Sequence, residues 1–227
     1  MAEIAVSVLD VEEENAVDYF YNIETAKIDF FHMDVMDGKF VERNNVELMK
    51  DYTLKIHNIC MTPIDVHLMV ENPRDYFDDF IDQGADRISF HIEACKDKEE
   101  VMSNIKYLVS NGVKASIAIS PDTSIEMLYD FLPYIHMVLI MSVVPGKGGQ
   151  KFIPGTDKKI CELRKYCEDN DIDIDIEVDG GINNVTCRDA VSSGATILVA
   201  GNYILSSDNY SKAVSDLKEE YIEREGE

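Results

Sequence analysis

The chain has 227 residues, of which 45% are hydrophobic and 29% are charged, and its formal net charge at pH 7 is −23. The apolar fraction excludes an intrinsically disordered chain and is sufficient for a sizeable buried core. The negative charge argues against nucleic acid and anionic membrane surfaces as partners, because both would be repelled.

No segment has the pattern of a targeting or membrane-spanning sequence. The longest purely apolar stretches, such as residues 137–141, have the length of a strand and are too short to cross a bilayer. The N-terminal sequence Met-Ala-Glu-Ile lacks the basic start and apolar core of an export signal. The five cysteines are odd in number and lack metal-knuckle spacing, which is typical of reduced thiols. These features predict a soluble cytoplasmic protein.

Short β-rich runs alternate with longer amphipathic segments about eight times, which is the number of pairs that closes a parallel barrel. The predicted strands begin near Ile4, Ile28, Ile64, Arg87, Lys114, Met137, Ile174 and Thr196. The predicted helices include residues 13–24, 73–83, 98–111, 124–132, 157–169 and 185–193, with a closing helix over 210–224. We therefore predict one α/β domain over residues 1–227, a single (β/α)8 TIM barrel. An open doubly wound sheet is the alternative, because alternation alone does not decide closure.

Residues 174–179 (IDIEVD) alternate apolar and acidic side chains with the period of a strand. Inside a barrel such an acidic row needs compensation, because an unpaired buried carboxylate is costly. We expect water, a cation or a metal beside this row, near the C-terminal end of the strand.

A candidate metal site combines imidazoles and carboxylates from three predicted strands. His32 and Asp34 share one strand face, His67 lies on the next strand, and Asp179 ends the acidic row. Two nitrogens and two carboxylates suit Zn, Fe, Mn or Co better than a thiolate-preferring ion or one that prefers oxygen ligands alone. The alternative is four isolated polar residues, but their positions at strand ends favour a shared site.

Glycine-rich turns follow the predicted sixth, seventh and eighth strands, where barrels commonly bind phosphate through backbone N–H groups. Ordinary tight turns are the alternative. A phosphate approaching this acidic molecule needs local positive potential, which amide dipoles, a metal and Lys147 can supply. The candidate phosphate-binding residues are Gly146, Lys147, Gly148, Gly149, Gly180, Gly181, Gly201 and Asn202.

Four segments resemble motifs of ribulose-phosphate 3-epimerases, in the order found in that family and over nearly the whole chain. They are residues 32–41 (HMDVMDGKFV), 65–70 (DVHLMV), 145–150 (PGKGGQ) and 178–182 (VDGGI). The resemblance implies a (β/α)8 barrel that inverts C3 of a ketose phosphate and interconverts ribulose 5-phosphate and xylulose 5-phosphate. Closely similar enzymes act on allulose 6-phosphate, so this sugar is an alternative substrate.

The resemblance also implies how the site works. One divalent metal ion per subunit (Zn, Fe, Mn or Co) would be held by His32, Asp34, His67 and Asp179. Asp34 and Asp179 would be catalytic, one removing the C3 hydrogen while the other protonates the opposite face. The divalent metal would stabilise the enediolate formed in between.

By the same resemblance, a small-molecule sugar phosphate would contact Ser7 and His67. Met36, Met69 and Met141 would form an apolar wall that protects the enediolate from solvent, with core filling as the alternative role. The resemblance further suggests a homo-oligomer.

Three other polar residues, His91, Glu93 and Glu177, are candidate partners behind the metal ligands. Polar packing in the barrel core is the alternative interpretation of their positions.

The chain departs from the family pattern in loops that would face the substrate. Ala5-Val6 replaces the usual Ser-Pro, Glu42-Arg43 replaces Pro-Asn, Lys147 replaces an aromatic residue and Asn202 replaces a common serine. None of these changes removes a predicted ligand, but they concern the identity of the sugar.

Two further functional classes stay open at this point. A non-catalytic phosphosugar-binding barrel would keep the pocket without turnover. A phosphate-binding aldolase is less consistent with the sequence, because no lysine falls at an obvious strand end beside the aspartates.

Overall fold

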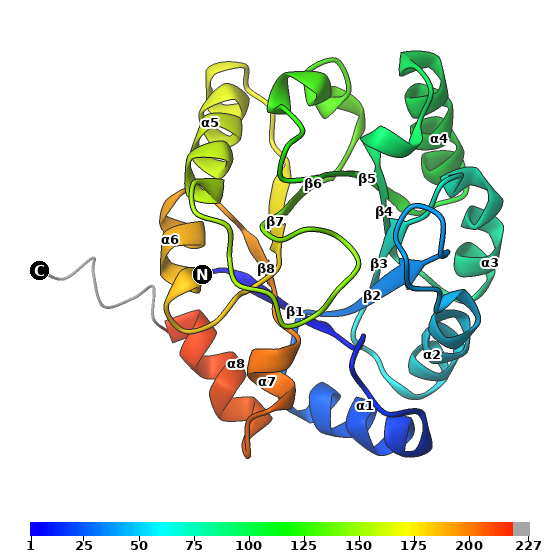
Figure 1. The fold of residues 1–227 in the computed structure, drawn as a ribbon, viewed down its shortest axis with the longest axis vertical. Coiled ribbons are helices and arrows are strands. Elements are labelled where there is room, and N and C mark those ends of the chain that lie inside the picture. Colours follow the sequence, from blue (N-terminus) through cyan, green and yellow to red (C-terminus); the bar gives the residue numbers. More distant parts are fainter. Residues whose placement is uncertain (220–227) are drawn as a thin grey trace, which may run out of the picture.

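The computed structural model describes residues 1–219, in which parallel strands close into a barrel with helices on the outside (Figure 1). Each strand pairs with its neighbour in sequence, and β8 pairs with β1 to close the sheet, which rules out the open doubly wound alternative. The predicted starts are confirmed to within two residues. The strands are β1 Glu3–Ser7, β2 Phe30–Met36, β3 Ile64–Met69, β4 Arg87–His91, β5 Lys114–Ile119, β6 Met137–Met141, β7 Asp175–Asp179 and β8 Ile197–Val199.

The helices connect successive strands and pack against the outer face of the sheet (Figure 1). The prediction for residues 73–83 becomes a 3₁₀ turn followed by α3, and residues 220–224 of the predicted closing helix lie outside the described residues. The α-helices are α1 Ala16–Thr25, α2 Val46–Ile59, α3 Phe77–Asp82, α4 Lys98–Ser110, α5 Thr156–Asp169, α6 Thr186–Ser192, α7 Asn202–Leu205 and α8 Tyr210–Glu219.

Other elements also differ from the sequence-based expectations. The predicted helix over residues 124–132 is wrong: only the 3₁₀ turns Ile125–Leu128 and Leu132–Tyr134 form there. Pro133 cannot donate a backbone hydrogen bond to residue 129 and disfavours an α-helical conformation at Leu132, so the last turn of the predicted helix cannot form. Helix α2 was not among the predicted helices, although its buried residues, including Val46, Met49 and Ile56, follow the spacing of an amphipathic helix.

Strand alternation divides the buried side chains into two layers. One set of strand residues packs against the surrounding helices, as Ile176 and Val178 do from β7. The other set points into the barrel, where Met137, Leu139 and Ile197 form a smaller apolar cluster. The interior therefore has an apolar region beside the polar residues of β2, β3, β4 and β7.

No helix within residues 1–219 has the length and apolar character needed to span a membrane.

Asp37 fixes the loop that leaves β2, next to the carboxyl ends of the strands. Its Oδ1 accepts hydrogen bonds from the N–H groups of Lys39 at 2.8 Å and Phe40 at 2.9 Å, and its Oδ2 accepts from the N–H of Glu71 at 2.8 Å. Burial raises the pKa of Asp37, but these donors outweigh it, so the pKa lies below its ordinary value.

We predict that Asp37→Asn lowers the free energy of unfolding at pH 7 by about 1–3 kcal/mol, because an amide presents only one acceptor oxygen to three donors. The carboxylate's stabilisation is fully present above the unfolded pKa of about 3.9 and is lost as the pH falls through the lower folded pKa. Urea unfolding should therefore show a difference from wild type that shrinks below about pH 4. The exposed Asp173→Asn variant is the matched control. A difference that is the same at pH 7 and pH 3 would contradict this assignment.

Candidate metal and proton-transfer site

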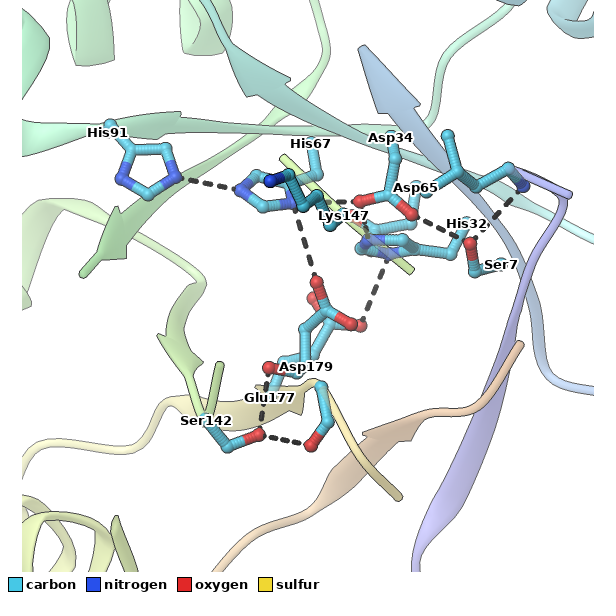
Figure 2. Close-up of polar contacts among 12 residues, drawn as sticks. Ser7, His32, Asp34, Asp65, His67, His91, Ser142, Lys147, Glu177 and Asp179 are labelled. Carbon is cyan, nitrogen blue, oxygen red and sulfur yellow. Dashed lines mark hydrogen bonds and ion pairs between the residues drawn. The ribbon is translucent and has the colours of Figure 1, made fainter. Parts of the chain in front are cut away.

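Four side chains converge at the carboxyl ends of β2, β3 and β7 (Figure 2). His32 and Asp34 are two residues apart on β2 and therefore face the same side. The parallel register places Asp34 directly beside His67 of β3. Asp179 is the last residue of β7, on the other side of β1 and β8. One ligand atom from each residue lies within 4.8 Å of the others, so the sequence-predicted metal set is brought together in space.

The atoms that face one another are two imidazole nitrogens and two carboxylates. His67 Nδ1 lies 3.2 Å from Asp34 Oδ1 and 3.7 Å from Asp179 Oδ2, and His32 Nε2 lies 3.5 Å from Asp34 Oδ1. Both imidazoles are fully buried, and the side chains of Asp34 and Asp179 are 6% and 14% exposed. The cluster is thus shielded from water on the protein side and open towards the cavity.

The donor set fits a divalent cation. His32 Nε2 is buried and has no hydrogen-bond partner among the described residues, although it faces the carboxylates. Such a buried polar atom is costly unless a further group satisfies it. Two imidazoles and two carboxylates are ligands that Zn, Fe, Mn and Co accept, and a cation would satisfy this nitrogen.

The two carboxyl groups have opposite pKa shifts. Burial raises the pKa of Asp34, but the charge and hydrogen bonds of His32 and His67 outweigh burial and hold it well below the usual range. Burial and the neighbouring Asp34 charge raise the pKa of Asp179 to about 7. The environments therefore favour a charged carboxylate at one position and ready protonation at the other.

The imidazoles differ in what lies behind them (Figure 2). His32 Nδ1 is 2.8 Å from Asp65 Oδ2. His67 Nε2 is 3.0 Å from Nε2 of His91, whose pKa is lowered by burial, as is that of His67. Burial also lowers the pKa of His32, but the carboxylates of Asp34 and Asp65 raise it well above its ordinary value. The raised pKa of His32 reports the negative potential of these carboxylates, which would also attract a cation in place of the proton.

The three carboxylates of β7 differ in the groups that they contact. Asp179 reaches the ligand set, whereas the fully buried Glu177 lies 3.9 Å from His32 Nδ1, and within residues 1–219 neither of its carboxylate oxygens has a hydrogen-bond partner. Asp175, lower on the strand, accepts a hydrogen bond from Thr196 Oγ1 at 3.1 Å. The acidic row is thus compensated at its two ends, and burial raises the pKa of Glu177 well above the ordinary value.

A cavity of about 680 Å³ opens above the four-residue cluster. Ser7 lies on its wall and donates a hydrogen bond from Oγ to Asp34 Oδ2 at 2.7 Å. The nearly fully buried Met36, Met69 and Met141 also line it. Four of the five residues predicted to contact a substrate therefore line one space, with an apolar side formed by sulfur-containing side chains, whereas the fully buried His67 is not among the lining residues.

The glycine-rich segments line the same cavity. They comprise the eight candidate phosphate-binding residues: Gly146, Lys147, Gly148, Gly149, Gly180, Gly181, Gly201 and Asn202. Two positions require glycine, because φ is +120° at Gly180 and +66° at Gly181, and an added Cβ would lie 2.4 Å from Val143 or from the backbone of Phe152. Lys147 is exposed at the rim.

The loop after β6 passes over the barrel mouth (Figure 1) and approaches loops from the opposite side. A Cβ added to Gly146 would lie 2.9 Å from Val41, and one added to Gly148 would lie 2.7 Å from Asp10 Oδ2. Gln150 holds this loop by donating to the carbonyl oxygens of Val144 and Lys147 at 2.7 and 2.9 Å. No role was predicted for Asp10, Val41 or Gln150, since no periodic pattern marks contacts between loops.

Asp65 lies inside a quoted motif and was not among the predicted metal ligands, and the structure places it behind His32. The available signal was its position two residues before His67, which places both on the interior face. His91 and Glu93 were considered as partners behind the ligands, and Glu93 Oε2 lies 3.0 Å from His91 Nδ1.

Comparison with known proteins agrees with these features. Residues 3–205 match the ribulose-phosphate 3-epimerase family. The ribulose-phosphate 3-epimerase of Methanocaldococcus jannaschii is 37% identical over 223 residues, which cover 98% of this chain and 92% of that protein. The enzyme of the same name from Bacillus subtilis is 34% identical over 219 residues, covering 96% of this chain and 99% of that protein.

Similarity among solved structures extends to more distant barrels. The crystal structure of KGPDC from Streptococcus mutans superposes with a TM-score of 0.70 at 12% identity, covering 100% of both chains, which shows a shared fold. The family match and the relatives go further than fold. The chain therefore belongs to the ribulose-phosphate 3-epimerase family, and it is a carbohydrate epimerase of the isomerase class.

Proposed function

We propose that the protein interconverts ribulose 5-phosphate and xylulose 5-phosphate by inverting C3, with Asp34 and Asp179 as the two proton-transfer residues. The observation that carries this proposal is their placement: they come from β2 and β7, two separate parts of the barrel wall, yet both lie within 3.7 Å of His67 Nδ1. Inversion needs an acid and a base on opposite faces of a planar intermediate, which carboxyls on separate strands can provide.

In the proposed cycle, one carboxylate removes the C3 proton and the other carboxyl returns a proton from the opposite face. A proton next to a ketone is weakly acidic, so its removal requires stabilisation of the enediolate charge. A single aspartate could only return the proton to the face from which it came. Ser7, which donates to Asp34, keeps one carboxylate oxygen engaged and thereby orients the other.

The residues His32, Asp34, His67 and Asp179 would hold one divalent cation, Zn, Fe, Mn or Co. When bound, such a cation supplies positive charge beside the developing enediolate oxygens. The support from this chain is the donor set and the unpartnered His32 Nε2.

The remaining cavity residues bind and shield the sugar phosphate in this proposal. Met36, Met69 and Met141 form the water-excluding wall next to the reacting carbon. The backbone N–H groups of the glycine segments, with Asn202 and Lys147, receive the phosphate.

A homo-oligomer is expected from the family resemblance. A reducing cytoplasm agrees with the five cysteines, all of which are free thiols.

We predict that Asp34→Asn and Asp179→Asn each lower epimerisation at least about 10²-fold, because each removes a proton-transfer group. In heavy water, wild type should incorporate deuterium at C3 of both epimers. Each variant should at most exchange one epimer without converting it, and the epimer that exchanges identifies the face served by the surviving aspartate.

The double variant should lose little more than either single variant, since both residues serve one cycle. Asp173→Asn, an exposed substitution, should behave as wild type. Normal conversion by either single variant with a confirmed fold and metal content would refute the assigned roles.

Metal removal gives an independent prediction. Treatment with a chelator should abolish turnover while the barrel stays folded by circular dichroism, and one equivalent of a divalent cation should restore it, because the enediolate charge is otherwise uncompensated. Elemental analysis should find one ion per subunit. Full turnover after verified metal removal would exclude this mechanism.

A substrate panel tests the sugar. We expect a higher kcat/KM for ribulose 5-phosphate than for allulose 6-phosphate, because the relatives with matching sequence are ribulose-phosphate 3-epimerases. The reverse preference would indicate that Lys147 and Asn202, which depart from the family pattern and line the cavity, recognise the longer sugar. Metal binding without turnover of either sugar would indicate a binding protein.

A further inference from the structure

The imidazole of His91 lies directly behind His67, one of the candidate metal ligands. His91 is the last residue of β4 and is fully buried. Its Nε2 lies 3.0 Å from His67 Nε2, and the two ring centroids are 5.1 Å apart (Figure 2). Because both atoms of this contact are ring nitrogens, one must carry the hydrogen and the other must accept it.

The direction of this hydrogen bond determines what His67 offers to the cavity. If His67 Nε2 carries the hydrogen, Nδ1 has a free lone pair that faces Asp34 and Asp179, where a cation would bind. If His91 donates instead, the hydrogen of His67 moves to Nδ1 and points into the ligand set, where it blocks coordination. The tautomer of His91 therefore decides between a competent ligand and an incompetent one.

Glu93 sets the tautomer of His91. Its Oε2 lies 3.0 Å from His91 Nδ1, so a charged Glu93 must accept a hydrogen from that nitrogen, which leaves His91 Nε2 as the acceptor. Burial raises the pKa of Glu93, but hydrogen bonds from His91, Thr123 and the Ser120 N–H lower it to about 2. Glu93 is thus a carboxylate, which can only accept.

The carboxylate itself is held in place from its other side. Glu93 Oε1 accepts from the Ser120 N–H at 2.7 Å and from Thr123 Oγ1. The loop that supplies these donors is fixed by Lys159 of α5, whose Nζ donates to the carbonyl oxygens of Ser120, Pro121 and Thr123. Phe40 packs on the His91 ring with centroids 4.8 Å apart. The pair is therefore anchored by three separate segments.

We propose that His91 and Glu93 are positioning residues that keep His67 in the tautomer whose Nδ1 can bind the cation. The inference rests on the metal role of His67 in the proposed function and goes beyond it by assigning the group that prepares this ligand. His32 has a carboxylate, Asp65, directly on its outer nitrogen. His67 has none, and the His91–Glu93 pair carries the influence of a carboxylate across one additional ring.

The test compares Glu93→Gln with Glu168→Gln. The first replaces the carboxylate by a group of the same shape that can donate as well as accept, and therefore permits the other His91 tautomer. The second makes the same chemical change at an exposed site on α5. Metal affinity is measured without sugar, by competition of Zn²⁺ between the protein and a chromogenic chelator. The visible spectrum of the Co²⁺-substituted protein reports the ligand geometry, and thermal unfolding of the metal-free proteins checks folding.

We expect Glu93→Gln to weaken Zn²⁺ binding about 10- to 100-fold and to change the Co²⁺ spectrum. Its kcat should recover towards wild type as the metal concentration is raised, with little change in KM. Glu168→Gln should match wild type in each measurement. If Glu93→Gln folds normally and binds Zn²⁺ as tightly as wild type with an unchanged Co²⁺ spectrum, the positioning role is wrong.

These readouts separate the two proposals. Failure of wild type to convert any ketose phosphate would refute the proposed function, whereas the metal affinities and Co²⁺ spectra would still test the positioning role. Should Glu93→Gln fail to fold, His91→Gln provides the second variant. Its amide oxygen can accept from His67 Nε2, so it should bind Zn²⁺ more tightly than His91→Leu, which removes the acceptor. Equal Zn²⁺ affinities for these two variants would also refute the inference.

Discussion

Asp34 and Asp179 share a water-poor space with His32 and His67, and the electrostatic balance among these four side chains governs how the rest of the site is built. Two carboxylates this close repel each other and lose hydration, which raises the pKa of Asp179 to about 7. The imidazoles relieve part of that repulsion, and a divalent cation would relieve more. The excess of negative charge makes this buried site energetically unfavourable on its own. The same negative charge attracts a cation and allows the carboxyl groups to exchange protons.

The groups behind the ligands reduce the unfavourable free energy of burying these polar side chains. Asp65 and the His91–Glu93 pair occupy the outer nitrogens of the two imidazoles, so neither ring can turn freely. Glu177 is fully buried and has no hydrogen-bond partner in the described part of the chain, and burial raises its pKa and so favours its neutral form. The buried carboxyl groups of Asp65 and Glu177 are therefore either engaged by a neighbour or driven towards neutrality.

The sequence was sufficient to predict the barrel, the strand positions and the convergence of the four ligands. Strand periodicity identifies which residues face inward, and parallel strands end at one rim. Periodicity does not give the height of a residue along the barrel axis, which depends on the stagger between strands. That is why the contact between His67 and His91, and the approach of Gly148 to Asp10, emerge only in three dimensions. The helix predicted over residues 124–132 forms only as 3₁₀ turns, and Pro133 excludes its last turn.

The spacing between His32, Asp34 and His67 is set by the parallel ladder that joins β2 to β3, whereas the residues that surround a sugar come mainly from loops. Backbone hydrogen bonds thus fix the geometry of the reacting centre independently of the segments that determine fit. Exchange of rim loops between related barrels can accordingly alter the length of sugar that is accepted without disturbing the cation ligands, so this architecture is well suited to diversification by recombination.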